Sequence, residues 1–191
     1  MIWIFGDSFA DPCESDVDYL WYKNLNDETT NFGKAGTGPI YTMSKVYSCI
    51  EEDQIQHGDK MVVMLSDPRR EEHYDGMHSR MCLVNYIYFL KVYSKNFNVR
   101  TIAFTCFNKD LDAKMVKRVD SSWFRRYEHS LSSVSVAETG EKIPERDSRS
   151  NHLGEKNHIV LAGIIRNHFY GETNMENWKR SKQEQEFIYD A

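Results

Sequence analysis

Several features that this chain lacks exclude whole classes of protein. Its four cysteines stand far apart and form no CxxC pair, so neither a zinc site nor a thiol redox motif is indicated. We expect reduced thiols in a cytosolic setting. The cysteines are Cys13, Cys49, Cys82 and Cys106.

An excess of positive charge is also missing. Lys and Arg number 24 against 29 Asp and Glu, which gives a net charge of -5. A protein that neutralises nucleic-acid phosphates needs the opposite balance, so we expect no nucleic acid as partner. No apolar run approaches the ~20 residues that span a bilayer. The first apolar run begins at residue 2 without a basic segment before it. We therefore expect no signal peptide, no membrane partner and a cytoplasmic location.

What is present is an alternation of apolar runs and amphipathic segments over a length that suits one domain. The pattern predicts an α/β fold with a five-stranded, mostly parallel sheet. We place the domain at 1–171, followed by a polar C-terminal extension at 172–191. Strands are expected at 2–5, 28–32, 60–66, 99–105 and 132–137, and helices at 17–25, 40–52, 77–94 and 153–170.

The most informative stretch is the first one, where the apolar run 2–5 leads directly into Gly6-Asp7-Ser8. Ligands and reactive groups gather at the carboxyl ends of strands in open α/β sheets. A hydroxyl there becomes a nucleophile if a base reaches it and N–H groups face the developing oxyanion. The alternative is that Asp7 or Ser8 simply caps the start of the next helix.

Two later stretches bear on that choice. Residues 31–38 form a glycine-rich loop that contains Gly36 and lacks the Gly-Lys-Ser/Thr ending of a nucleotide-binding Walker loop. His152 comes just before the last expected helix, while His158 lies inside it. We expect His158 to pack against the sheet, and His152 either to act as a base or to hydrogen-bond within its loop.

Taken in this order, the motifs resemble those of the SGNH (GDSL-type) hydrolases. Gly6-Asp7-Ser8 is similar to their first block, 31–36 to their second and 152–158 to their last. The resemblance implies a flavodoxin-like three-layer α/β/α sandwich and ester hydrolysis through an acyl-enzyme on Ser8. It also implies that His152 is the base and that the N–H of Gly36 contributes to the oxyanion hole.

The chain departs from that family at two positions. Where the third block supplies an asparagine, the strand 61–65 runs into Ser66-Asp67-Pro68, and proline cannot donate a hydrogen bond. Ser66, Arg69 and Arg70 are the candidates to replace it. The aspartate of the last block is Arg149 here, and the nearest carboxylate is Asp147. Either Asp147 or a backbone carbonyl orients His152, or Ser8 and His152 act as a dyad.

We therefore expect a serine esterase for small acyl or O-acetyl esters, including glycan esters, with no cofactor and no metal. A non-catalytic binding or structural protein on the same fold is the alternative. A third hypothesis is an interaction module that docks a partner through 114–127 or through 172–191. Glu71, Glu72, His73, Asp75 and His78 could suggest a metal site, but an exposed charged loop is the simpler interpretation.

Overall fold

The computed structural model of this chain describes residues 1–12, 20–66, 76–106, 123–126, 153 and 155–171. Its strands are β1 (Ile2–Phe5), β2 (Thr29–Asn31), β3 (Lys60–Leu65), β4 (Arg100–Thr105) and β5 (Phe124–Arg126). Its helices are the short 3-10 helix η1 (Trp21–Asn24) and the α-helices α1 (Pro39–Glu51), α2 (Gly76–Phe97) and α5 (Glu155–Tyr170).

The strands form one sheet in the order β2-β1-β3-β4-β5, and each neighbouring pair is parallel. The register sets Ile2 beside Lys60 and Lys60 beside Arg100, so the three central strands begin at the same level. Because a parallel sheet is covered on both faces, its strands read as continuous apolar runs. That is the pattern in β1 and β3, where only Lys60 is incompletely buried.

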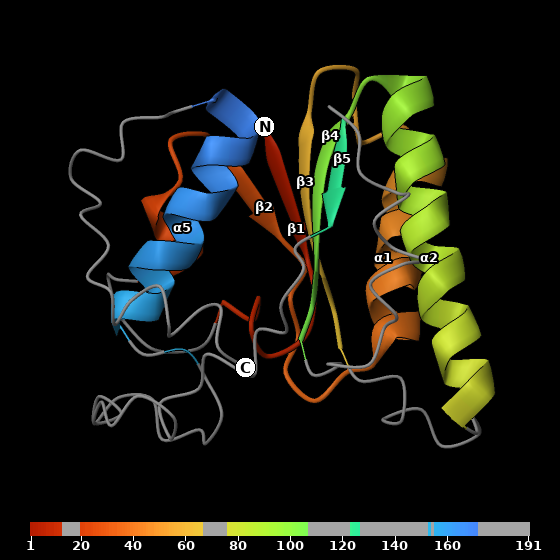
Figure 1. Cartoon of the computed structure of the whole chain (residues 1–191). Coiled ribbons are helices and arrows are strands. Elements are labelled where there is room, and N and C mark those ends of the chain that lie inside the picture. Colours follow the sequence, from red (N-terminus) through yellow and green to blue (C-terminus); the bar gives the residue numbers. More distant parts are fainter. Residues whose placement is uncertain (13–19, 67–75, 107–122, 127–152, 154, 172–191) are drawn as a thin grey trace.

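Helices cover both faces of this sheet. Figure 1 shows α1 and α2 on one side and α5 on the other, with the sheet edge-on between them. The side chains of β1 divide accordingly: Ile2 and Ile4 pack in the cluster that contains α5 residues, whereas Trp3 and Phe5 pack with α1 and α2. The alternation follows from the period of two along a strand.

The direction of the helices decides which edge of the sheet gathers the loops. Each parallel strand is followed by a crossover, so the next helix begins near the carboxyl end of the strand before it. In Figure 1 the first turns of α1, α2 and α5 all lie at the end where β1, β3 and β4 finish. The residues that follow these strands therefore meet the amino ends of the helices.

Four of the predicted strands are confirmed, at β1, β2, β3 and β4, and the helices at α1, α2 and α5 are confirmed within three residues at each end. The predicted strand 132–137 and the C-terminal extension 172–191 lie outside the described residues. In the described part of the chain, no helix has the length and apolar character needed to cross a membrane.

The predicted helix 17–25 is wrong in its described half, where only the four residues of η1 are helical. Leu20 and Leu25 have extended backbone torsions. The N–H of Trp21 donates to the His158 side chain at 3.3 Å, so it does not take part in a helical ladder. A contact 137 residues away in sequence thus replaces the helical hydrogen bond.

The predicted strands do not include residues 124–126, where the structure has β5. Phe124 is fully buried, and β5 pairs with β4 through Thr101 and Phe124. The N–H of Thr101 also donates to the Trp123 carbonyl at 2.8 Å. Burial of one aromatic ring and pairing with an existing strand edge are enough to hold three residues extended.

Candidate active site

The turn after β1 is built by Asp7. Its carbonyl accepts the N–H of Ala10 at 3.0 Å and that of Asp11 at 2.9 Å. Its carboxylate Oδ1 accepts the N–H of Phe9 at 3.1 Å, which is an Asx turn. Asp7 therefore holds this turn through its own backbone and side chain. The alternative that Asp7 or Ser8 caps the start of the next helix is not supported here, because residues 8–10 form a turn and no helix follows within residues 7–12.

Gly6 lets the turn approach β3. A Cβ at this position would lie 2.8 Å from the Cβ of Ala10 and 2.8 Å from that of Met64. Such separations are too short for carbon atoms, so glycine is required for close packing. The next two residues, Asp7 and Ser8, consequently follow β1 directly beside the end of β3.

Ser8 lies in this turn at the carboxyl end of the sheet, as its sequence position predicted. The residue is 7% exposed and its hydroxyl oxygen is buried. In this conformation the Ser8 hydroxyl is shielded from bulk water. A substrate can reach it only if the groups that cover it rearrange.

The loop after β2 is tied to the same turn. Asn31 Nδ2 donates to the Ala10 carbonyl at 2.7 Å, and the N–H of Ala35 donates to Asp11 Oδ2 at 2.6 Å. A Cβ on Gly33 would lie 2.3 Å from the Ala10 carbonyl carbon, so the two backbones touch. The glycine-rich loop is thus packed on the turn that carries Ser8.

Gly36 lies further along this loop and is exposed. Its φ of +77° is left-handed, and a Cβ there would meet nothing within 4 Å. Glycine is needed at this position for its backbone torsion rather than for space.

Two buried hydroxyls mark the ends of the next strands. Ser66 follows β3 and Thr105 ends β4, each 1% exposed. Neither hydroxyl has a hydrogen-bond partner among the contacts of the described residues. An unsatisfied buried hydroxyl costs about 1–3 kcal/mol, so two at one edge require an explanation.

Cys106 connects β4 to the Ser8 turn. Its N–H donates to the Leu65 carbonyl at 2.8 Å, and its thiol donates to Asp7 Oδ1 at 3.5 Å. The Asp7 carboxylate thus receives donors both from its own turn and from a strand 99 residues later.

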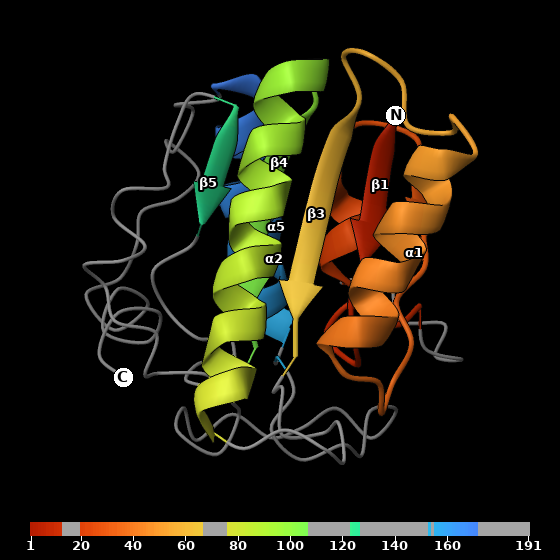
Figure 2. The same cartoon turned by 90° about the vertical axis from the view of Figure 1, so that its right-hand side faces the viewer.

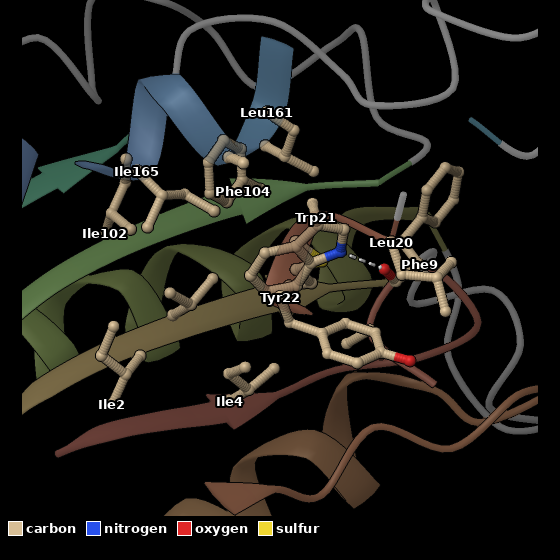
Figure 3. Packing of buried hydrophobic residues seen from close by; sticks show 14 of the residues in the cluster. Ile2, Ile4, Phe9, Leu20, Trp21, Tyr22, Ile102, Phe104, Leu161 and Ile165 are labelled. Carbon is tan, nitrogen blue, oxygen red and sulfur yellow. Dashed lines mark hydrogen bonds between the residues drawn. The ribbon is translucent and has the colours of Figure 1, made fainter. Parts of the chain in front are cut away.

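Trp21 connects the Ser8 turn to α5. Figure 3 shows its indole N–H directed at the carbonyl of Phe9, at 2.8 Å, in the middle of the apolar cluster. Its backbone N–H donates to Nδ1 of His158 on α5. Trp21 is fully buried, so both contacts are protected from water. His158 is therefore buried and accepts a hydrogen bond from η1, while its expected packing against the sheet stays a prediction.

The other predicted site residues, His152, Asp147, Arg69 and Arg70, lie outside the described residues. Leu153, which follows His152, is buried in the same apolar cluster as Phe9, which follows Ser8. Both segments therefore contribute to one core at this edge of the sheet. Ser8, Gly36 and Ser66 are the predicted residues that the structure describes there.

Within the described part of the chain, no three His, Cys, Asp or Glu side chains approach one another as metal ligands would. The charged stretch 71–75 lies outside it, and so does the basic-aromatic stretch 114–122.

Sequence reasoning missed the roles of Trp21 and Cys106. The sequence predicts a helix across Trp21 and a reduced thiol at Cys106, and neither prediction indicates these contacts. A signal existed for Cys106, because it directly follows a predicted strand and so lies at the same edge as Ser8. The sequence contained no signal for Trp21, whose partners are 12 and 137 residues away.

Comparison with known proteins adds no assignment. No protein-family model matches this chain, and no curated protein matches it significantly.

Proposed function

We propose that this chain is a serine esterase of the SGNH type, on a flavodoxin-like three-layer fold, that cleaves small acyl or O-acetyl esters. The strand order β2-β1-β3-β4-β5 is the order of flavodoxin-like sheets, which supports the fold. The observation that carries the function is Ser8 itself, a serine in a tight Asx turn at the carboxyl end of a central strand.

The proposed chemistry is acyl transfer in two steps. His152 takes the proton of Ser8 as the hydroxyl oxygen attacks the ester carbonyl, and the N–H groups of Ser8 and Gly36 stabilise the oxyanion. Collapse of the tetrahedral intermediate expels the alcohol, which receives the proton from His152. Water then attacks the acyl group with His152 again as base, and Ser8 is regenerated. Asp147 orients His152, and no cofactor enters.

A third oxyanion donor is expected from Ser66, Arg69 or Arg70. The burial of Ser66, and the lack of a hydrogen-bond partner for its hydroxyl among the described contacts, support Ser66 as one candidate. A guanidinium offers several fixed N–H donors, which favours an arginine, with Arg70 ahead of Arg69. Changing the contributing residue to Ala should lower kcat more than it raises KM.

The burial of Ser8 supports a small acyl group. A nucleophile that is shielded from bulk water admits a compact acetyl group with less rearrangement than a long chain. We therefore expect kcat/KM for p-nitrophenyl acetate to exceed that for the butyrate and octanoate esters.

The decisive experiment is labelling with a fluorophosphonate, followed by peptide mapping. We expect one adduct, on Ser8, and loss of both labelling and p-nitrophenyl acetate hydrolysis in Ser8→Ala. Ser48→Ala, which changes an exposed serine of α1, is the matched control and should keep both. An adduct on another residue, or hydrolysis that survives Ser8→Ala, would contradict the proposal.

A non-catalytic binding protein on the same fold is the second candidate. It is favoured by the burial of the Ser8 hydroxyl and by Pro68 where the family has a donor residue. It predicts a chain that is neither labelled by fluorophosphonate nor active on any ester in the series above.

A further inference from the structure

The outer surface of α1 and α2 carries large apolar side chains in an ordered pattern. On α1 the exposed residues Ile40, Ser44, Tyr47 and Glu51 are spaced four, three and four residues apart, and Ser48 is exposed beside them. On α2 the exposed residues Met81, Asn85, Tyr88, Val92 and Lys95 follow the same spacing, and Asn96 and Phe97 are exposed at its end. Spacing of this kind keeps side chains on one stripe of a helix and is typical of a helix-packing seam.

These stripes face outward. Ile40 is 43% exposed, Met81 58%, Tyr88 57% and Val92 47%. Figure 2 views this side of the molecule directly, and no other described element lies in front of α1 and α2. Several large exposed apolar groups on adjoining helices indicate an interaction surface.

The two stripes match each other level by level. The rings of Tyr47 on α1 and Phe89 on α2 are in contact, with their centroids 4.7 Å apart. This contact places Tyr47 at the same height along the helix axes as Tyr88 and Phe89. Both helices run in the same direction in Figure 2 and rise equally per residue. Ile40 is therefore level with Met81, and Ser44 with Asn85.

Charge completes the match at the far end. α2 contains no Asp or Glu in its 22 residues and has Lys95 in its last turn, whereas α1 ends in Glu51, followed by Glu52 and Asp53. By the same levels Glu51 lies beside Val92, and Lys95 follows Val92 by three residues, about 5 Å along the helix and within reach of its long side chain. This surface has an acidic helix end next to a basic helix end. A two-fold rotation places the acidic end of each copy against the basic end of the other, so the surface is complementary to itself.

We propose that two copies of this chain associate through α1 and α2, around a two-fold axis that runs along the groove between these helices. Each α1 then lies on the α2 of the other copy, and every contact occurs twice, as in an isologous dimer. Ile40 meets Met81, Ser44 hydrogen-bonds Asn85, Tyr47 meets Tyr88, and Glu51 pairs with Lys95.

The expected affinity is modest. The matched stripes extend about 20 Å along two adjacent helices of about 10 Å diameter, which is the footprint of a small interface. Such an interface belongs to a dimer that dissociates on dilution rather than to an obligate one. This association is independent of the esterase proposal, since it uses none of the residues at the carboxyl edge.

The test measures the molar mass of the whole chain by sedimentation equilibrium over a concentration range of about a hundredfold. We expect a monomer–dimer equilibrium, and a shift of Kd by at least about tenfold toward monomer in Tyr88→Glu, because a charge is buried against Tyr47. Ile159→Glu is the matched control, since Ile159 is also exposed, at 45% against 57% for Tyr88, but lies on α5, on the opposite face. It should leave Kd unchanged.

A charge exchange tests the orientation of the dimer. Glu51→Lys should weaken dimerisation by up to about fivefold, and adding Lys95→Glu to the same chain should restore it, as exposed pairs of this kind are worth little. A monomer at every concentration overturns the proposal, and so does a dimer insensitive to Tyr88→Glu. A double variant weaker than either single variant overturns the proposed axis.

Discussion

The two edges of the sheet differ in how their polar groups are paired. At the amino edge, Asp59 accepts the indole N–H of Trp3 at 2.8 Å and the N–H of Gln56 at 3.0 Å, and it also pairs with the amino terminus. Lys60 forms an ion pair with Asp27 at 2.5 Å. At the carboxyl edge, Ser66 and Thr105 keep buried hydroxyls without a hydrogen-bond partner among the described contacts.

From this difference we infer that the polar groups of the amino edge serve the stability of the fold, whereas those of the carboxyl edge are available to a ligand. Polar groups that already have hydrogen-bond partners within the protein contribute to its stability. They have no spare donor or acceptor for a ligand. Buried hydroxyls without partners lower stability, and they are retained where another molecule can use them. We expect substitutions at the amino edge to change stability alone and substitutions at the carboxyl edge to change activity.

The largest expected effect concerns Ser8. Ser8→Ala should lower ester hydrolysis by at least about a thousandfold, because the acyl-enzyme cannot form. The midpoint of thermal unfolding should stay within a few degrees, since a small polar group at a turn contributes little packing. Steady-state kinetics and a thermal melt measure both. A loss of activity accompanied by a large loss of stability would indicate that Ser8 is structural.

Gly33→Ala should reduce stability by about 1–3 kcal/mol, because the added methyl group overlaps the Ala10 backbone. Activity should fall with it, since the Ser8 turn is displaced. Gly58→Ala at the amino edge is the comparison: its φ of +88° strains an alanine, but its surroundings are open. Urea titration should show the larger loss for Gly33→Ala, and equal losses would mean that the loop is loosely packed.

Trp21 and Trp3 allow a direct comparison of the two edges, since each indole N–H donates at 2.8 Å. Both Trp→Phe variants should lose about 1 kcal/mol of stability with the hydrogen bond. Only Trp21→Phe should also lower kcat, by about tenfold, because Trp21 fixes the Ser8 turn against α5. A decrease in kcat for Trp3→Phe of the same size would contradict the division between the edges.

Ser66→Ala should leave stability unchanged or raise it by up to about 1 kcal/mol, because it removes a buried hydroxyl that has no partner among the described contacts. Ser94→Ala is the matched control, since the hydroxyl of this buried serine bonds the Leu90 carbonyl and Thr101 Oγ1, both at 2.6 Å. That variant should lose about 1 kcal/mol. Chemical denaturation gives the free energy of unfolding of both variants. It shows whether removing a hydroxyl without a described partner costs less stability than removing one that forms two hydrogen bonds.

The smallest effect is expected for Asp27→Asn. The hydrogen bond from Lys60 lowers the pKa of Asp27 below its ordinary value of 3.8. A carboxylate with a lowered pKa stabilises the fold above its unfolded pKa, and this stabilisation is lost as pH falls through the folded pKa. Thermal melts should therefore show a small deficit for Asp27→Asn at neutral pH that begins to shrink near pH 3.8 and vanishes as pH falls through the lower pKa of the folded state. The exposed neighbouring change Glu28→Gln should show no such deficit.

The sequence predicted most of the sheet because β1 and β3 are almost entirely apolar and the middle of β4 is apolar. It did not predict β5, where Phe124 supplies the buried ring and two arginines follow. It also misassigned η1, because the contacts of Trp21 depend on His158 rather than on neighbouring residues. Local patterns determine strands that are buried throughout, whereas short elements depend on partners that are distant in sequence.

For the site, parallel topology was sufficient to predict that Ser8 and Ser66 lie at one edge. The contacts around these two serines could not be predicted from the topology. The bond between Asp7 and Cys106 joins two strands that are not adjacent in the sheet, because β3 lies between them. The docking of Gly33 on Ala10 depends on the exact path of two loops, which residue types alone do not specify.

The thiol of Cys106 is a natural probe of motion at the carboxyl edge. It is completely buried against Asp7, so an alkylating reagent modifies it only while this edge is transiently open. Cys49 lies on the buried side of α1, where burial raises the pKa of its thiol, and it reports on opening between α1 and the sheet. The ratio of the two alkylation rates in the native protein, followed by mass spectrometry, would measure how often the carboxyl edge opens independently of global unfolding.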